Sequence, residues 1–163
     1  MPIDLKIIET GNGGDLVNIG NDLAVTSTIG GMIYLCLFGG NLKESTDPNN
    51  INIQSFDWWG NSFMKNDPSQ QMNSLTERTL NSIVLTSGGA SVISNAVKQD
   101  LKALSKYITF SVSVKLPAIN VVQIEITVTK IETSQEGVLI INLRKTVSGD
   151  FSILDFSGLD FLI

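Results

Sequence analysis

The first part of the chain alternates between apolar and polar residues, which is the pattern of short strands. Ile3, Leu5 and Ile7 fall on one face of an extended segment. The segments DLVNI and DLAVT alternate in the same way, and Gly20-Asn21 between them has the chemistry of a tight turn. The pattern therefore predicts a short N-terminal β-hairpin.

Helical periodicity begins after residues 26–28, whose hydroxyl groups suit the N-cap of a helix. The run IGGMIYLCLFGG then places apolar side chains on one helical stripe and ends at Gly39-Gly40. The stripe consists of Ile29, Met32, Ile33, Cys36 and Leu37. We expect one short helix that is buried.

Polar residues dominate from 41 to 66, which predicts a long loop. This loop contains FDWWGN, with both tryptophans of the chain. Trp58 and Trp59 suit either a ligand platform or an anchor that pins the loop onto its own domain or a partner chain, with Gly60 letting the backbone turn. A platform needs an indole face open to solvent, whereas an anchor buries both, and we favour the anchor.

Two amphipathic helices are predicted next. Asp67-Pro68-Ser69-Gln70 is typical of a helix start, with Asp67 as the N-cap. Residues 87–89, Ser-Gly-Gly, predict a hinge before a second helix from about Ala90 to Ser105. The apolar positions are Met72, Leu75, Leu80, Ile83 and Val84 in the first helix, and Val92, Ile93, Ala96, Val97, Leu101 and Leu104 in the second.

The hydrophobic period then changes from 3.6 to 2, which predicts an antiparallel sheet with one wet face. Residues 108–116 and 122–129 alternate, and Pro117-Ala118 lies between them as a turn. A third strand, from Val138 to Val147, begins with four consecutive apolar residues. We therefore predict an α+β fold with about three C-terminal strands. The third strand is the predicted edge for strand addition, through Val138, Ile140, Asn142 and Arg144.

The last fifteen residues, 149–163, break the strand pattern and combine phenylalanines with aspartates. Two interpretations have equal weight: a tail that lies in a groove of its own domain, or an arm that docks on a neighbour through Phe151, Phe156 and Phe161. The predicted organisation is one α+β domain over 1–148, followed by a C-terminal tail or docking arm over 149–163.

Composition narrows the possible chemistry. The 163-residue chain is 42% hydrophobic and contains no histidine and one cysteine. Without histidine there is no Ser-His-Asp triad and no His-ligated metal, and Cys36 is expected to be a buried small hydrophobe. The carboxylates are too dispersed for a calcium loop. We predict no catalytic residue, no cofactor and no metal site. The short apolar runs and the N-terminus further predict a protein that is made in a cytoplasm and does not enter membranes.

Charge is distributed unevenly within the net charge of -5. Residues 1–70 have eight acids and three bases, residues 71–148 have five acids and eight bases, and residues 149–163 have three acids and no base. This polarity suits head-to-tail self-association or a partner of opposite polarity. The basic residues are scattered singly, so nucleic acid is not an expected partner.

The order of these segments resembles the baseplate wedge protein of Mu-like contractile-tailed phages. The resemblance rests on GDLVNIGNDLAVTSTIGGMIYLCLFGG, the WWG of the loop, the helix pair and ITFSVSV, and covers roughly residues 4–130. That family resembles in turn the lysozyme-named wedge protein of T-even phages and its type VI secretion counterpart. The chain departs from the pattern at Ser55-Phe56-Asp57 and at Ser105-Lys106-Tyr107, where arginine-bearing motifs stand in the family or its relatives.

The resemblance implies a structural virion component in the tail baseplate of a phage, prophage or tail-like contractile injection system. Its implied partners are other wedge proteins and the tail sheath protein, whose assembly it would nucleate by strand addition. Such a particle is assembled in the bacterial cytoplasm.

Two other functions compete with this one. A lysozyme-like enzyme acting on peptidoglycan requires two carboxylates across a cleft, for which Glu77 and Asp57 are the pair that the sequence offers. Because Glu77 adjoins Arg78 on a predicted helix, a solvated helix face explains it more simply. The other alternative is a free-standing carbohydrate-binding or adhesion module that uses Trp58 and Trp59.

Overall fold

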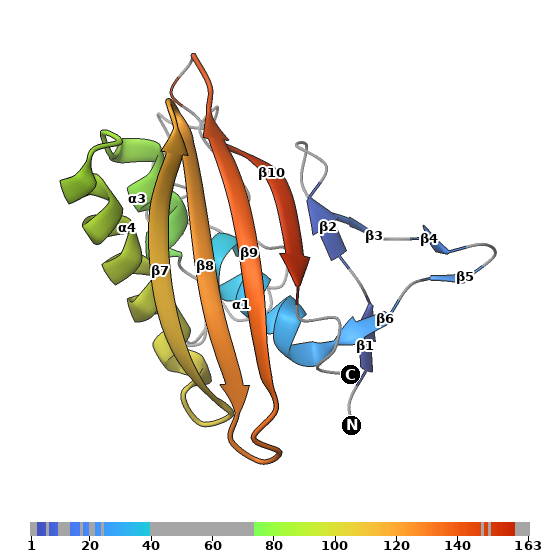
Figure 1. Ribbon diagram of the computed structural model, residues 1–163. Helices are drawn as coiled ribbons and strands as arrows, with labels where there is room; N and C mark the ends of the chain where they lie inside the picture. Colours follow the sequence, from blue (N-terminus) through green and yellow to red (C-terminus); the bar gives the residue numbers. More distant parts are fainter. Residues whose placement is uncertain are drawn as a thin grey trace, which may run out of the picture.

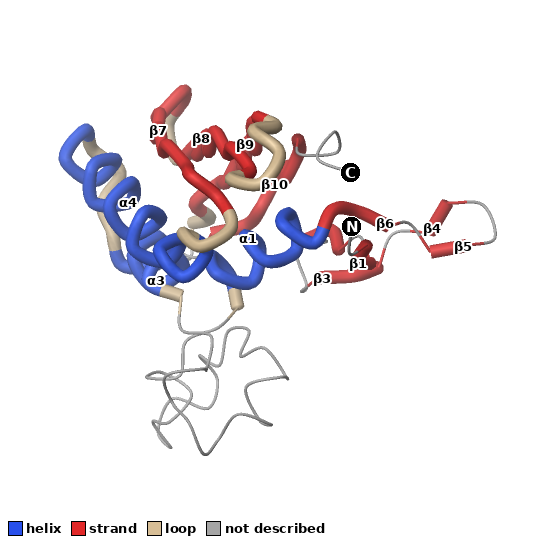
Figure 2. The backbone as a smooth tube through the Cα atoms, turned by 90° about the horizontal axis from the view of Figure 1, so that it is seen from below, coloured by secondary structure: helices blue, strands red, loops and turns tan. Residues whose placement is uncertain are grey.

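The computed structural model contains a four-stranded antiparallel sheet with helices packed on one face, which is an α+β fold (Figures 1 and 2). Within the described residues there are three α-helices and one short 3-10 helix. The structure describes residues 3–5, 7–9, 14–16, 18–19, 22–23, 25–39, 74–147, 149 and 151–158.

The sheet consists of strands β7 to β10 in the spatial order β10-β9-β8-β7. Their bounds are Ile108–Ala118 for β7, Val121–Lys130 for β8, Glu136–Lys145 for β9 and Phe151–Gly158 for β10. All neighbouring pairs are antiparallel. Alternating hydrophobicity predicted β7 and β8, and a run of apolar residues predicted β9. The fourth strand comes from the segment that was expected to be a tail.

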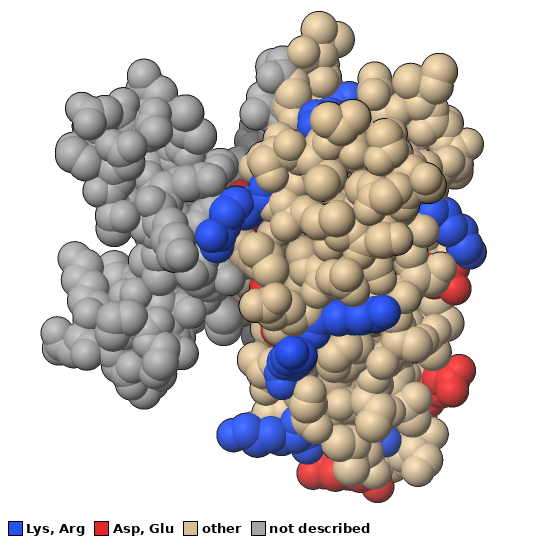
Figure 3. Space-filling view, turned by 90° about the vertical axis from the view of Figure 1, so that its left-hand side faces the viewer, with Lys and Arg blue, Asp and Glu red and all other residues tan. Residues whose placement is uncertain are grey.

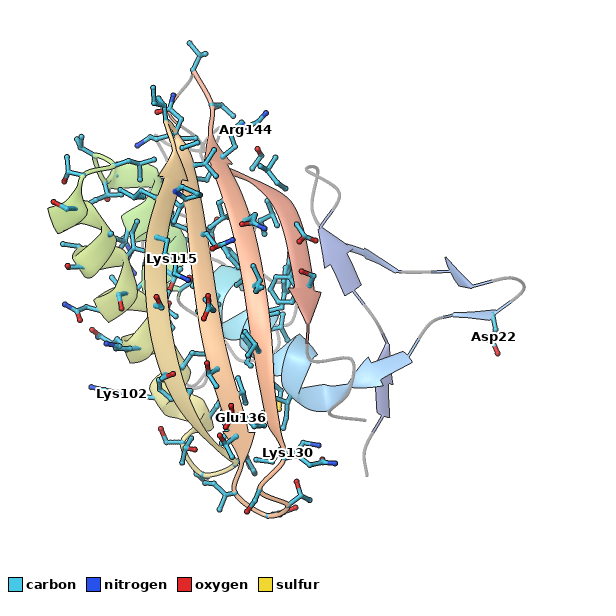
Figure 4. All side chains as sticks on the ribbon, viewed as in Figure 1. Asp22, Lys102, Lys115, Lys130, Glu136 and Arg144 are labelled. Carbon is cyan, nitrogen blue, oxygen red and sulfur yellow. The ribbon has the colours of Figure 1, made fainter. Side chains whose placement is uncertain are left out.

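The two faces of the sheet differ in composition because side chains alternate along each strand. The inward residues of β8 and β9 are buried against the helices: Val122, Ile124, Ile126, Val128, Leu139, Ile141 and Leu143. The outward face is polar, with a hydrogen bond of 3.1 Å from Gln123 to Asn142 and an ion pair of 2.9 Å between Lys115 and Glu125 (Figure 4). The predicted wet face is therefore present.

Three helices and a helical turn cover the inward face, as the view from below shows (Figure 2). They are α1 at Thr28–Phe38, α3 at Leu75–Ser82, α4 at Ser87–Asp100 and the 3-10 helix η4 at Leu101–Leu104. In α1, Ile33 and Leu37 are fully buried, as the periodicity predicted. The buried residues of α4 and η4 are Gly89, Ile93, Ala96, Val97, Leu101 and Leu104.

The break between α3 and α4 lies earlier than the Ser-Gly-Gly triplet. Ile83 ends α3, and Thr86 caps α4 by accepting a hydrogen bond of 3.1 Å from the Gly89 backbone N–H. Both glycines therefore lie in the first turn of α4, and the predicted hinge there is wrong. Val84 is 75% exposed because it lies in this connection, outside either apolar face.

Six short strands precede α1 among the described residues of the N-terminal segment. They are β1 at Ile3–Leu5, β2 at Ile7–Glu9, β3 at Gly14–Leu16, β4 at Asn18–Ile19, β5 at Asp22–Leu23 and β6 at Val25–Ser27. They pair antiparallel as β1 with β6, β2 with β3 and β4 with β5. The structure thus has three short ladders where the sequence predicted one hairpin.

Candidate functional site

Several predicted site residues lie outside the described residues. They are Trp58, Trp59, Gly60, Asp57 and Phe161, together with the predicted N-cap Asp67. The choice between platform and anchor for the tryptophans therefore stays a prediction. The candidate site must be built from residues 74–158.

The predicted strand-addition edge is wrong, because β9 is an interior strand. In the register of the sheet, Ile140 lies between Glu125 of β8 and Ser157 of β10. Asn142 and Arg144 also have partners on both sides, whereas Val138 pairs with β8 beyond the end of the β9–β10 ladder. The backbone groups of β9 already serve two ladders, so this strand cannot accept another.

The segment that fills the second side of β9 is the predicted docking arm. Phe151 and Phe156 face inward from β10 and pack against the core of this same domain. The Phe156 ring meets Tyr34 of α1 with centroids 5.6 Å apart, and the Lys145 ammonium lies 5.3 Å from the Phe151 ring centroid. Of the two interpretations of the tail, residues 151–158 follow the first: they lie on their own domain.

The edges of the sheet are therefore β7 and β10, and they differ in accessibility. β10 has a bulge between Ile153 and Asp155, and β2 contacts it (Figure 1). Bulges and covering segments are common means of blocking an edge. β7 is longer, keeps regular register with β8 from Ile108 to Lys115, and has β8 as its one ladder partner within the described residues.

The inward side of β7 is covered less completely than that of β8. Phe110, Val112, Val114 and Leu116 are half-buried, although they occupy the same face as the fully buried residues of β8. A groove of about 540 Å³ runs between β7 and α4. Val114 and Leu116 line one wall, and Ser87, Ala90, Ser91, Ser94, Asn95 and Lys98 line the other. The short side chains of α4 leave the groove open. We call this groove and the β7 edge together the β7 groove.

A partly buried carboxylate, that of Asp100, fixes α4 beside α3. The Asp100 carboxylate accepts hydrogen bonds from the backbone N–H groups of Leu75 at 3.1 Å and Thr76 at 2.8 Å, and from the Thr76 hydroxyl at 2.7 Å. A carboxylate at a helix N-terminus meets unpaired N–H groups and the positive end of the helix dipole. Ser74 joins α1 as well, because its hydroxyl donates to the Leu37 carbonyl.

Burial raises the pKa of the Asp100 carboxyl, and its hydrogen bonds to Thr76, Leu75 and Ser74 oppose that rise. These bonds hold the carboxylate against α3, so we assign it a structural role. Cys36 lies in the same region, where burial and the Asp100 charge raise its thiol pKa to about 11. The thiol therefore stays protonated near neutral pH and is a poor nucleophile.

Glu77 does not lie on a solvated helix face, contrary to the prediction. It is buried in the first turn of α3, and its backbone N–H donates to the Ser74 hydroxyl at 3.0 Å. The described ranges contain no group of three His, Cys, Asp or Glu residues placed to hold a metal ion. No helix in the described part of the chain is long and apolar enough to cross a bilayer.

Comparison with known proteins adds no relative. No family model matches the chain, and neither the curated proteins nor the solved structures contain a significant match. The resemblance to phage wedge proteins therefore stays a hypothesis based on the order of its segments.

Sequence reasoning missed the β7 groove, although part of its signal was present. The regular alternation of residues 108–116 marks a long strand, and serines and alanine recur along the first half of α4. Neither pattern tells which strand lies at the end of the sheet, since that depends on the position of residues 151–158.

Proposed function

We propose that this protein is a non-enzymatic component of a contractile-tail or tail-like baseplate, and that it accepts a strand from a neighbouring subunit at the β7 groove. The baseplate part of the proposal is supported by the resemblance of residues 4–130 to wedge proteins. The strand-accepting part is supported by one observation above all, the edge of β7, which has no second ladder partner among the strands that the structure describes.

An added strand would bind first through its backbone. An edge strand presents a row of N–H and C=O groups, and these supply much of the affinity when a peptide extends a sheet. With eight residues in regular register, from Ile108 to Lys115, β7 offers enough length for a stable ladder.

Side chains of the added strand would complete the cover of β7. Its inward residues would lie over the half-buried Val114 and Leu116, next to the short side chains of α4. Removing the remaining exposed surface of two aliphatic side chains from water is worth on the order of 1–3 kcal/mol. This hydrophobic contribution would also set the register, because a shift of one residue turns the apolar side chains outward.

A pair of lysine substitutions tests this binding mode. Val114→Lys places an ammonium group in the groove, where an added strand would bury it without a partner. We expect the full chain carrying this change to bind the tail sheath protein of its own source about tenfold more weakly or worse, in a co-purification assay with purified subunits. Ser113→Lys is the matched control, because Ser113 is exposed on the outward face opposite Glu125.

Circular dichroism and thermal unfolding of both variants separate binding from folding. Equal co-assembly by folded Val114→Lys and Ser113→Lys proteins would contradict strand addition at β7. A source genome without sheath and tube genes near this one would contradict the baseplate assignment itself.

A further inference from the structure

Positive charge predominates on the surface around the β7 groove. Lys98 of α4 lines the groove, and Lys102 and Lys106 follow it along the chain, all three exposed. In the view onto this side, lysine and arginine side chains cross the surface while Asp and Glu appear at its margins (Figure 3).

The acidic residues of α4, β7 and β8 compensate little of this positive charge. Asp100 is the one acid in α4, and its carboxylate is directed into the junction with α3. β7 contains no acid, and Glu125 of β8 pairs with Lys115 on the outward face at 2.9 Å. Lys98 and Lys102 therefore dominate the field at the end of the groove.

Building on the proposed function, we infer that the β7 groove selects an acidic strand, meaning an extended segment whose inward side chains are aliphatic over Val114 and Leu116 and acidic toward the Lys98 end of the groove. Because alternate side chains of a strand share one face, both kinds point toward α4, and the carboxylates approach Lys98 and Lys102. Charge complementarity of this kind raises association rates and rejects partners of like charge. The serine and asparagine side chains of the α4 wall offer further donors to carboxylate oxygens.

The selectivity can be measured directly by fluorescence anisotropy, as labelled nine-residue peptides bind to the full chain. Three peptides have Val at two alternate positions, Glu, Lys or Thr at the next two alternate positions, and Thr at all intervening positions, so that the variable residues share one face with Val. We expect the Glu peptide to bind about tenfold more tightly than the Lys peptide at low ionic strength, and this ratio to fall as salt is added. The double variant K98E/K102E should reverse the preference.

Two controls assign the effect to the groove. Arg144→Glu changes an exposed cation on the outward face, away from the groove, and should leave the ratio unchanged (Figure 4). Val114→Lys should weaken the Glu and Thr peptides alike, since it blocks the strand site and not a charge contact.

The outcomes separate this inference from the function on which it rests. Equal binding of the three peptides, abolished by Val114→Lys, would overturn acidic selectivity and keep strand addition at β7. Absence of binding by every peptide would overturn the inference, and sheath co-assembly that ignores Val114→Lys would overturn strand addition itself. Self-association of the full chain that Val114→Lys abolishes, with no peptide preference, would make a second copy the occupant and also overturn the inference.

Discussion

The Asp100 carboxylate and the Ser74 hydroxyl together join three helices. The carboxylate takes the N-terminal N–H groups of α3, and Ser74, which starts that helix, reaches the last turn of α1. The groups satisfied here are those that a helix end leaves unpaired. The position of α4, and with it one wall of the β7 groove, therefore depends on Asp100.

The stability contributed by Asp100 should change with pH. Because its pKa is raised in the fold, the folded chain holds the proton more tightly than the unfolded chain. The contribution is full below about pH 4, the usual range of an aspartate, and falls as pH rises through the folded pKa. The asparagine side chain of Asp100→Asn does not titrate. The free energy of unfolding of this variant, relative to that of the wild type, should therefore increase over this rise in pH.

Urea denaturation of wild type and Asp100→Asn from pH 3.5 upward measures this difference. The other acids are common to both proteins, so their effects cancel in the comparison. If the wild type instead gains unfolding free energy relative to the variant as pH rises, hydrogen bonding outweighs burial in setting the pKa of Asp100.

Two neighbouring glycines give opposite predictions. A Cβ on Gly89 would lie 2.3 Å from the Val84 carbonyl oxygen, whereas one on Gly88 would lie 3.8 Å from its nearest neighbour, the Thr86 hydroxyl. We expect Gly89→Ala to destabilise the protein by about 1–3 kcal/mol, because backbone must move. Gly88→Ala should stabilise it by roughly 0.5–1 kcal/mol, since alanine has less freedom to lose in a helix. Thermal unfolding of the two variants compares them, and equal effects would refute the close contact at Gly89.

At the scale of elements, the order of the strands decides what each can do. β9 was the most apolar predicted strand and for that reason the predicted edge, yet its apolar character reflects an interior position between β8 and β10. The strand that can accept a partner, β7, has exposed Thr109, Ser111, Ser113 and Lys115 on one face and a partly covered apolar face on the other.

Proline at Ile140 tests the interior position of β9. Because proline removes a donor and is excluded from central strands, Ile140→Pro should destabilise the whole sheet by about 3 kcal/mol or more. Ile140→Thr keeps a β-branched side chain on the polar face and should cost much less. Far-UV circular dichroism with urea denaturation measures both. A folded Ile140→Pro protein with unchanged stability would contradict the two ladders on β9.

At the scale of the whole molecule, the sheet has one protected end and one exposed end. β2 flanks β10 (Figure 1), and the Phe156 and Tyr34 rings join β10 to α1, whereas β7 borders an open groove. Under the proposed strand addition, this asymmetry would direct a partner to β7.

Truncation after Val147 tests the role of the C-terminal segment. Loss of β10 exposes the second edge of β9 and removes Phe151, Ile153 and Phe156 from the core. We therefore expect a lower unfolding temperature and concentration-dependent self-association, measured by calorimetry and light scattering. An unaltered, monomeric and equally stable truncated protein would restore the interpretation of 149–163 as an arm for a neighbour.

The sequence by itself determined the local structure of residues 74–147. Periods of 3.6 and 2 predicted two helices and two strands, because burying one face of an element demands apolar residues at its own repeat. A run of four apolar residues predicted the third strand. The same patterns correctly assigned the inward residues of β8, whereas the four consecutive apolar residues from Val138 left the inward face of β9 unassigned. The patterns misplaced the break before α4, since Ser-Gly-Gly suits the first turn of a helix as well as a hinge when Thr86 can cap it.

Only the tertiary structure decided which strand is an edge. Periodicity describes which face of a strand is buried, but it carries no information about what pairs with its two sides, because backbone groups are the same in every residue. The placement of 151–158 beside β9 closed one edge, and the short side chains of α4 left β7 uncovered. Both depend on contacts between segments far apart in the chain, so the candidate site became visible only once the strands were in order.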